Sequence, residues 1–307
     1  MKRLFTFFLS IILLFSCTSC ESIENSDKIS VVCTIFAPYD WTSNIIGDND
    51  DIDLIWLINT GVDIHSYQPT AQDILKIKSA DLLICSGGEL DSWAYESLDD
   101  TSKALKLNDF VELKKAEHID EAENDKHKEH SPGYDEHIWL SLSNAMKLCD
   151  KITDRLCALT EENSQIFKSN NEIYKKKIDA LDDELSLKVE SKCKPLIFAD
   201  RFPFIYFTQD YKLSYFAAFD GCSADTQSSF ETVIFLSQKV NENNISYVFT
   251  VDSGNTAIAT TVIDNCFGNV EELNLNSLQS ISQTDADNDV NYVKIMEQNI
   301  KKVIKAL

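Results

Sequence analysis

The sequence predicts an α/β protein of two lobes, each built on a mostly parallel β-sheet, with a long helix joining them. Short, continuous apolar runs alternate with helical segments in both halves of the chain, which is typical of strands covered on both faces. A helical stretch without glycine or proline, 161–192, separates the two halves. At the usual rise per residue, the part from 161 to 190 would be roughly 45 Å long, longer than one lobe. We therefore expect a rigid spine helix and a ligand cleft between the lobes.

The N-terminal lobe is predicted to cover 29–160. Three apolar runs read as strands, at 29–36, 54–58 and 82–85. Thr70 and Asp73, placed after a proline, form the pattern of a capping box, so a helix begins there between the last two strands. The order strand, helix, strand predicts a βαβ unit.

The C-terminal lobe is predicted to cover 193–307, where the alternation starts again. The expected strands are 196–199, 213–219 and 247–251, and the expected helices are 230–243, 255–266 and 288–307. Ligands of parallel sheets gather outside the carboxyl ends of the strands, so we expect the functional residues in the loops that follow them.

The first 20 residues have the pattern of a secretory signal. Two basic residues precede an apolar run, 4–15, that is too short to span a bilayer. Small residues directly before Cys17 and Cys20 resemble the lipobox of bacterial lipoproteins, with Cys17 slightly favoured. A lipid on that cysteine would hold the protein on the outer face of the membrane, with 21–28 as a tether. The alternative is an ordinary cleaved signal.

The charge of the chain is strongly acidic, with a formal net charge of -22. A surface of that sign repels nucleic acid, which excludes a nucleic-acid partner. We expect a monomer in solution.

An acidic, polar segment at 117–136 interrupts the first lobe and predicts a mobile loop. It contains His118, His127 and His130. These histidines could form a weak auxiliary metal site, or the loop could bind nothing; the sequence leaves both open.

Two further histidines lie in loops where they could bind a ligand. His65 follows the second predicted strand and leads into a helix, and His137 lies where the acidic loop ends and a helix begins. A neutral imidazole nitrogen suits zinc and other borderline metals. Either histidine alone would be weak evidence, because a lone loop histidine is usually just a solvated side chain.

Several spaced motifs together resemble the metal-binding solute receptors of zinc and manganese importers. They are Gly61-x-Asp63-x-His65-Ser66-Tyr67-x-Pro69-Thr70, Ala80-Asp81-Leu82, Gly88-Glu89-x-x-x-Trp93, His137-Ile138-Trp139-Leu140 and Asp200-Arg201-Phe202-Pro203-Phe204-x-Tyr206. The resemblance covers nearly the whole mature chain. It implies a metal ion in the cleft, held by two ligands from each lobe.

Carried over residue by residue, the resemblance makes His65 and His137 ligands from the first lobe. The third ligand segment reads Asp200-Arg201, where the family has His or Glu; arginine stays protonated, so Asp200 is the expected donor. Asn276 stands where the family commonly has an acid. Its amide is a weak ligand for zinc, and water could take its place. Zinc is the expected ion, with manganese possible.

The resemblance implies a receptor that delivers the ion to the membrane permease of an ABC importer, not an enzyme. Alternatives are a manganese or iron receptor of the same fold, an extracellular zinc hydrolase with Glu136 as base, and an adhesin. The chain has no H-E-x-x-H and no visible Ser/His/Asp signature, which disfavours a hydrolase. A receptor for siderophores or cobalamin could share the two lobes but would need a wider cleft.

Overall fold

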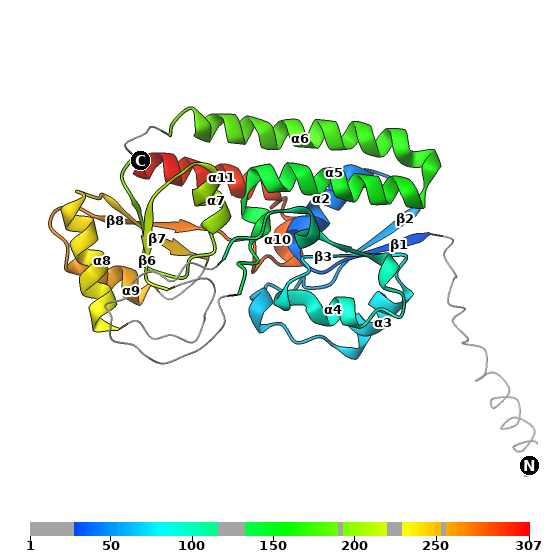
Figure 1. The fold of residues 1–307 in the computed structure, drawn as a ribbon, viewed down its shortest axis with the longest axis horizontal. Coiled ribbons are helices and arrows are strands. Elements are labelled where there is room, and N and C mark those ends of the chain that lie inside the picture. The colour runs from blue at the N-terminus through cyan, green and yellow to red at the C-terminus, as the bar shows by residue number, and fades with distance from the viewer. Residues whose placement is uncertain (1–27, 116–132, 190–192, 220–228, 253–255) are drawn as a thin grey trace, which may run out of the picture.

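The computed structural model describes residues 28–115, 133–189, 193–219, 229–252 and 256–307. Two α/β lobes lie side by side, and one long helix runs above both of them (Figure 1). This confirms the predicted fold class. The predicted signal segment, the lipobox cysteines and the three histidines of the acidic loop lie outside the described residues.

The N-terminal lobe contains four parallel strands in the order β2-β1-β3-β4. Their bounds are Ile29–Cys33 for β1, Ile52–Trp56 for β2, Leu82–Cys85 for β3 and Ala104–Lys106 for β4. The helices of this lobe are α2 (Phe36–Ile46), α3 (Ala71–Ser79), α4 (Ser92–Glu96) and α5 (Leu142–Leu159). The predicted capping box is present: the Thr70 hydroxyl accepts from the Asp73 amide at 3.2 Å, and α3 begins there.

The C-terminal lobe repeats this plan, with parallel strands in the order β6-β5-β7-β8. The strands are β5 (Leu196–Phe198), β6 (Tyr215–Ala217), β7 (Tyr247–Val251) and β8 (Glu271–Leu275). The helices are α7 (Ile205–Asp210), α8 (Phe230–Glu242), α9 (Ala257–Asp264), α10 (Gln283–Asp287) and α11 (Tyr292–Ala306). The last helix begins four residues later than expected because Asn291 caps it, accepting from the Lys294 amide at 3.0 Å.

The long helix α6 (Ser164–Ser186) runs along both lobes and packs against α2, α5 and α11 (Figure 1). Its buried face recurs at helical spacing, from Phe167 through Tyr174 and Ile178 to Leu185. The helix has 23 residues, roughly 35 Å, and is shorter than expected at both ends: Glu161–Asn163 form a 3-10 turn before it, and it ends at Ser186. The predicted long helix is confirmed, while the exact lobe boundaries stay a prediction.

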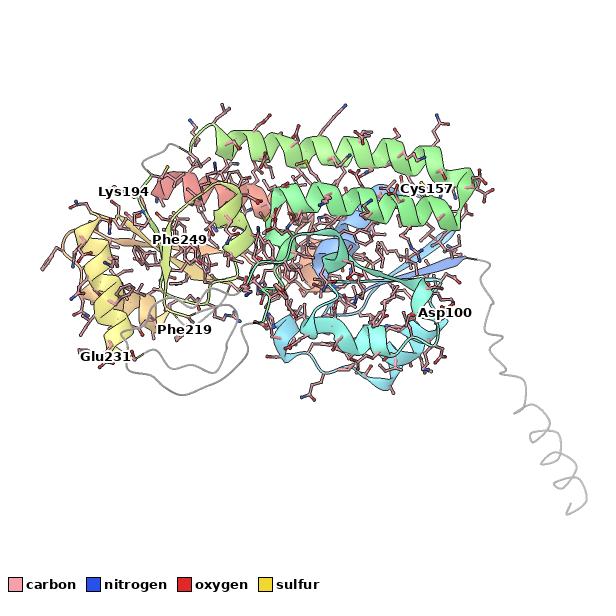
Figure 2. All side chains as sticks on the ribbon, in the orientation of Figure 1. Asp100, Cys157, Lys194, Phe219, Glu231 and Phe249 are labelled. Atoms are coloured by element: carbon pink, nitrogen blue, oxygen red, sulfur yellow. The ribbon has the colours of Figure 1, made fainter. Side chains whose placement is uncertain are left out.

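The largest hydrophobic cluster is continuous across both lobes, and a smaller one lies beneath α8 and α9. Figure 2 shows side chains filling the space between each sheet and its helices, with Phe249 fully buried in β7. Cys33 and Cys85 are buried, as predicted, and burial raises the pKa of the Cys33 thiol to about 12. No helix in the described part of the chain is long and apolar enough to cross a bilayer.

Candidate metal centre

His65 is held at the carboxyl end of β2 by the aspartate two residues before it. Asp63 is the N-cap of a 3-10 turn, Ile64–Ser66, and its Oδ1 accepts a hydrogen bond from the His65 amide at 3.0 Å. Its Oδ2 accepts from the Arg201 guanidinium at 2.7 Å. Burial raises the pKa of the Asp63 carboxyl, but these hydrogen bonds outweigh it and hold the pKa below its ordinary value. Asp63 is therefore a carboxylate that fixes the backbone of His65.

His137 is held in the same way, and more tightly. The Oδ1 of Asp135 accepts from the His137 amide at 2.9 Å and lies 2.9 Å from the His137 Nδ1. Both residues are buried, His137 to within 2% and Asp135 to within 6% of full burial. A 3-10 turn, Ile138–Leu140, follows directly and is also buried. The ring of His137 has little freedom to turn away.

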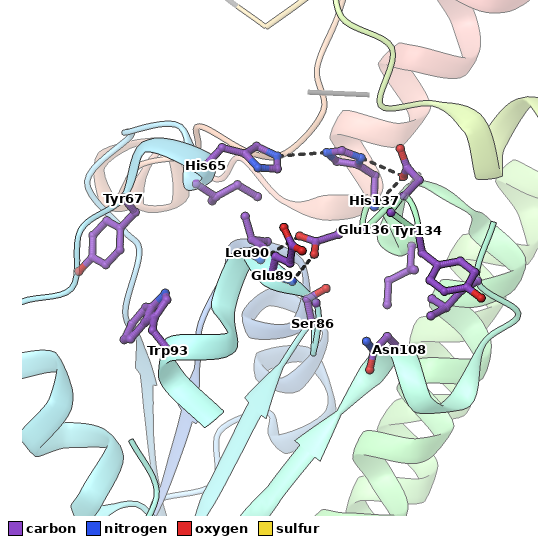
Figure 3. A pocket seen from close by; sticks show the side chains of 16 residues that line it. His65, Tyr67, Ser86, Glu89, Leu90, Trp93, Asn108, Tyr134, Glu136 and His137 are labelled. Atoms are coloured by element: carbon purple, nitrogen blue, oxygen red, sulfur yellow. Dashed lines mark hydrogen bonds and ion pairs between the residues drawn. The ribbon is translucent and has the colours of Figure 1, made fainter. Parts of the chain in front are cut away.

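The two histidines meet head to head. Their Nε2 atoms are 3.4 Å apart, and the two tilted rings point these nitrogens at each other (Figure 3). Two nitrogens that each lie about 2.05 Å from a zinc ion at a tetrahedral angle are about 3.3 Å apart. The spacing therefore fits two imidazoles that share one tetrahedral ion.

Asp135 decides which nitrogen of His137 carries the hydrogen. A carboxylate can only accept, so the Nδ1 of His137 donates to it and the Nε2 lone pair points at His65. This is the tautomer that a metal ligand needs. A carboxylate that accepts from the far nitrogen of a ligating histidine also raises the basicity of the nitrogen that binds the metal. His137 thus has the tautomer and the fixed orientation that a metal ligand needs.

Below the histidines lies an open cavity of about 850 Å³. Tyr67 and Trp93 line one side of it, and Glu136 projects toward the loop after β3 (Figure 3). The Glu136 carboxylate accepts from the amides of Glu89 and Leu90, the latter at 3.0 Å. Burial raises the pKa of Glu136 above its ordinary value. These bonds tie the loop of His137 to the first sheet.

The carboxylate of Asp200 joins the ends of two strands of the second sheet. Its Oδ1 accepts from the Arg201 amide at 2.8 Å and its Oδ2 accepts from the Val251 amide at 2.9 Å. The residue is 7% exposed, and burial raises the pKa of its carboxyl. Both oxygens therefore serve the backbone in this structure.

Asn276 likewise uses its side chain locally. Its Oδ1 accepts from the backbone amide of Leu278 at 2.8 Å, while its backbone N–H donates to the Asn299 Oδ1 at 3.0 Å. Within the described ranges, no group of three or more His, Cys, Asp or Glu side chains is placed to hold one ion. The structure thus brings two of the four predicted ligands together, and the complete set stays a prediction.

The supporting aspartates are the functional residues that the sequence reasoning missed. Asp63 and Asp135 stand two residues before His65 and His137, and in both cases the carboxylate accepts the histidine amide. The repeated Asp-x-His spacing was the signal that could have found them. Tyr206, in α7, was also missed in this role: its hydroxyl donates to the Asp135 carbonyl at 2.6 Å.

Nearly the whole chain is similar to known proteins. The chain is 28% identical over 307 residues to the zinc-binding lipoprotein AdcA of Streptococcus pneumoniae, covering 98% of this chain and 60% of that protein. It is 27% identical over 292 residues to the high-affinity zinc uptake system protein ZnuA of Bacillus subtilis, covering 93% of this chain and 89% of that one. The chain thus spans less than two thirds of the streptococcal relatives.

Solved structures show the same architecture. The Zn(II)-bound ZnuA-like domain of Streptococcus pneumoniae AdcA is 26% identical, with a TM-score of 0.72 over 91% of this chain and 98% of that one. A Mn-bound periplasmic metal-binding protein from Candidatus Liberibacter asiaticus, 20% identical, shares the fold with a TM-score of 0.72 over 91% of this chain and 99% of that one. The family model for the periplasmic component A of the zinc-uptake complex, ZnuA, matches residues 31–306, and the chain belongs to that family.

Proposed function

We propose that the protein captures a divalent transition-metal ion outside the cytoplasm, with zinc as its preferred ion, and delivers it to the permease of an ABC importer. The observation that carries the proposal is the histidine pair, with Nε2 atoms 3.4 Å apart and one ring prepared by a buried carboxylate. Imidazole nitrogen favours zinc over manganese, which prefers oxygen ligands. Two relatives, one named for zinc binding and one for zinc uptake, support the same choice.

His65 and His137 are the proposed primary ligands. Asp200 and Asn276 remain the proposed oxygen donors from the other lobe, because a carboxylate or amide oxygen that accepts one hydrogen bond keeps a second lone pair. Manganese is the second proposed ion. Its binding would depend more on these oxygens than on the histidines.

A receptor role fits the site better than hydrolysis. A zinc hydrolase needs a free base beside the ion. Glu136 is next to His137 in sequence, but its carboxylate is occupied by two backbone amides of the loop after β3. We therefore propose that Glu136 is structural and that the protein is not an enzyme.

The volume of the cavity favours one second candidate. About 850 Å³ is far more than a bare ion fills and lies in the range of small-molecule pockets. A receptor for a metal bound to a small organic chelator would use that space. Zinc binding that requires an added chelator would favour this candidate over the first.

The test is metal binding by the purified chain. We expect one zinc per chain by elemental analysis, and loss of most zinc affinity in His65→Ala and in His137→Ala, measured by competition with a chromophoric chelator. Asp200→Ala and Asn276→Ala show whether the second lobe supplies ligands. Unchanged zinc affinity in both histidine variants would reject the site.

The cellular location is a separate proposal with its own test. We propose a lipid anchor at Cys17 or Cys20 that holds the protein on the outer face of the membrane. Membrane fractionation of Cys17→Ala and Cys20→Ala chains identifies the lipidated residue. Full retention in the membrane fraction when both cysteines are replaced would contradict a lipid anchor.

A further inference from the structure

One arginine connects the two lobes beside the histidine pair. Arg201 follows β5 at its carboxyl end, in the C-terminal lobe. Its Nη1 is 2.7 Å from the Asp63 Oδ2 in the other lobe, and its Nη2 is 3.8 Å from the Asp252 Oδ2 in its own lobe. The side chain of Arg201 is 15% exposed, so this ion pair is largely shielded from solvent.

The C-terminal end of this connection is firmly held. Asp252 follows β7, and its Oδ1 accepts from the Ser277 amide at 2.8 Å while its Oδ2 accepts from the Ser277 hydroxyl at 2.5 Å. Both bonds go to Ser277, which follows β8, so the carboxylate links the ends of β7 and β8. This fixed charge also orients Arg201, which reaches Asp63 in the other lobe.

The N-terminal end of the connection leads to the metal site. The Asp63 oxygen that does not contact Arg201 accepts the amide of His65. A charge-assisted hydrogen bond restrains its acceptor more strongly than a neutral one. The position of the His65 turn is thus coupled, through Asp63, to the guanidinium of the opposite lobe.

We infer that Arg201 is a positioning residue for metal binding: by holding Asp63 of the other lobe, it sets the His65 turn in the place where the His65 Nε2 meets that of His137. This inference rests on the proposed function. Arg201 itself stays protonated and does not touch the ion. The contact between the two lobes and the position of the His65 ring are then coupled through Asp63.

Simple charge repulsion predicts the opposite effect. If Arg201 acted only as a nearby positive charge, removing it would strengthen the binding of a divalent cation. Positioning predicts weaker binding. The sign of the change in affinity therefore separates the two explanations.

The experiment measures zinc affinity of the full chain, with zinc alone as the probe, in Arg201→Gln, Asp63→Asn and the double variant. Arg201→Lys keeps the charge but loses the planar fork. Arg155→Gln is the matched control, because Arg155 donates to the Ser102 carbonyl at 2.8 Å within the N-terminal lobe. Cobalt(II) in place of zinc reports ligand geometry through its visible absorption bands.

Supporting groups behind a ligand typically contribute 10- to 100-fold to metal affinity. We expect Arg201→Gln and Asp63→Asn each to weaken zinc binding about 10-fold, the double variant to match a single one, and Arg201→Lys to fall between. The cobalt bands should change in these variants and stay the same in the control.

Unchanged or tighter zinc binding in Arg201→Gln would overturn the inference, as would additive effects in the double variant, since the two residues would then act separately. If Arg201→Gln does not fold, Asp63→Asn and Arg201→Lys carry the test. Failure of the proposed function has a different signature: the unaltered chain itself would bind no zinc.

Discussion

Replacing Asp135 tests how far the metal site depends on the carboxylate behind His137. Asp135→Asn keeps the size of the side chain and an oxygen that can accept from Nδ1, but it removes the charge. Asp135→Ala removes both. Because the carboxylate accepts from the amide and the ring of His137 with one oxygen, at 2.9 Å each, either change loosens the ring and weakens its nitrogen as a ligand.

The size of the effect follows from the kind of bond. Hydrogen bonds to a charged partner are roughly twice as strong as neutral ones, and loss of a carboxylate behind a ligating histidine costs about 10- to 100-fold in metal affinity. The near-complete burial of both side chains means that water does not replace the lost bond. We expect about 10-fold weaker zinc binding for Asp135→Asn, about 1.4 kcal/mol, and about 100-fold for Asp135→Ala.

The assay is competition with a chromophoric zinc chelator at pH 7.5. Asp100→Asn is the matched control, because Asp100 also accepts the amide two residues on, from Ser102 at 3.0 Å, but on an exposed turn far along the chain from either histidine. It should leave zinc affinity unchanged. Zinc binding by Asp135→Ala within 2-fold of the unaltered chain would refute the prepared-ligand argument.

Three further substitutions test the packing and the buried hydrogen bonds of the fold. Gly88→Ala places a methyl group into the Glu136 carboxylate and should lower both the melting temperature and zinc affinity; Gly133→Ala, which meets nothing, should do neither, and equal effects in both would contradict this. Burial raises the pKa of Asp40 to about 6, so stability should fall as pH rises from about 4 to about 6, by about 3 kcal/mol, and Asp40→Asn should remove that loss. A difference in unfolding free energy between the two chains that is equal at pH 4 and pH 7 would exclude it. Tyr292→Phe leaves a buried carbonyl oxygen without its donor and should cost about 1–3 kcal/mol in urea unfolding; no loss would show that the carbonyl finds another partner.

Strands with apolar sequences were predictable, including the half-exposed edge strands β2 and β6, and strands with polar sequences were not. The predicted runs 82–85 and 247–251 match β3 and β7, and those for β1, β2, β5 and β6 differ from the observed ends by up to three residues. β8 lies at the edge of its sheet with mostly exposed or half-exposed side chains, so its polar sequence carries no strand signal. β4, Ala104–Lys106, contains a single buried residue and no continuous apolar run.

The site was predictable to the extent that it depends on local pattern. His65 and His137 were placed together through resemblance and loop position, and their rings do meet. The direction of the Asp200 carboxylate was not predictable, because its Oδ2 partner, the Val251 amide, lies 51 residues away and on another strand. The partner of each Asp200 oxygen depends on how β5 and β7 pair, which the spacing of residues in the sequence does not encode.

His65, Arg201 and Asp252 all lie in segments that leave the carboxyl ends of parallel strands. None of the three residues lies within a strand. The proposed metal site thus lies in loops, apart from the strands that form the two sheets. A designer who wished to retune this protein toward another metal could therefore rewrite these loops and leave the two sheets untouched.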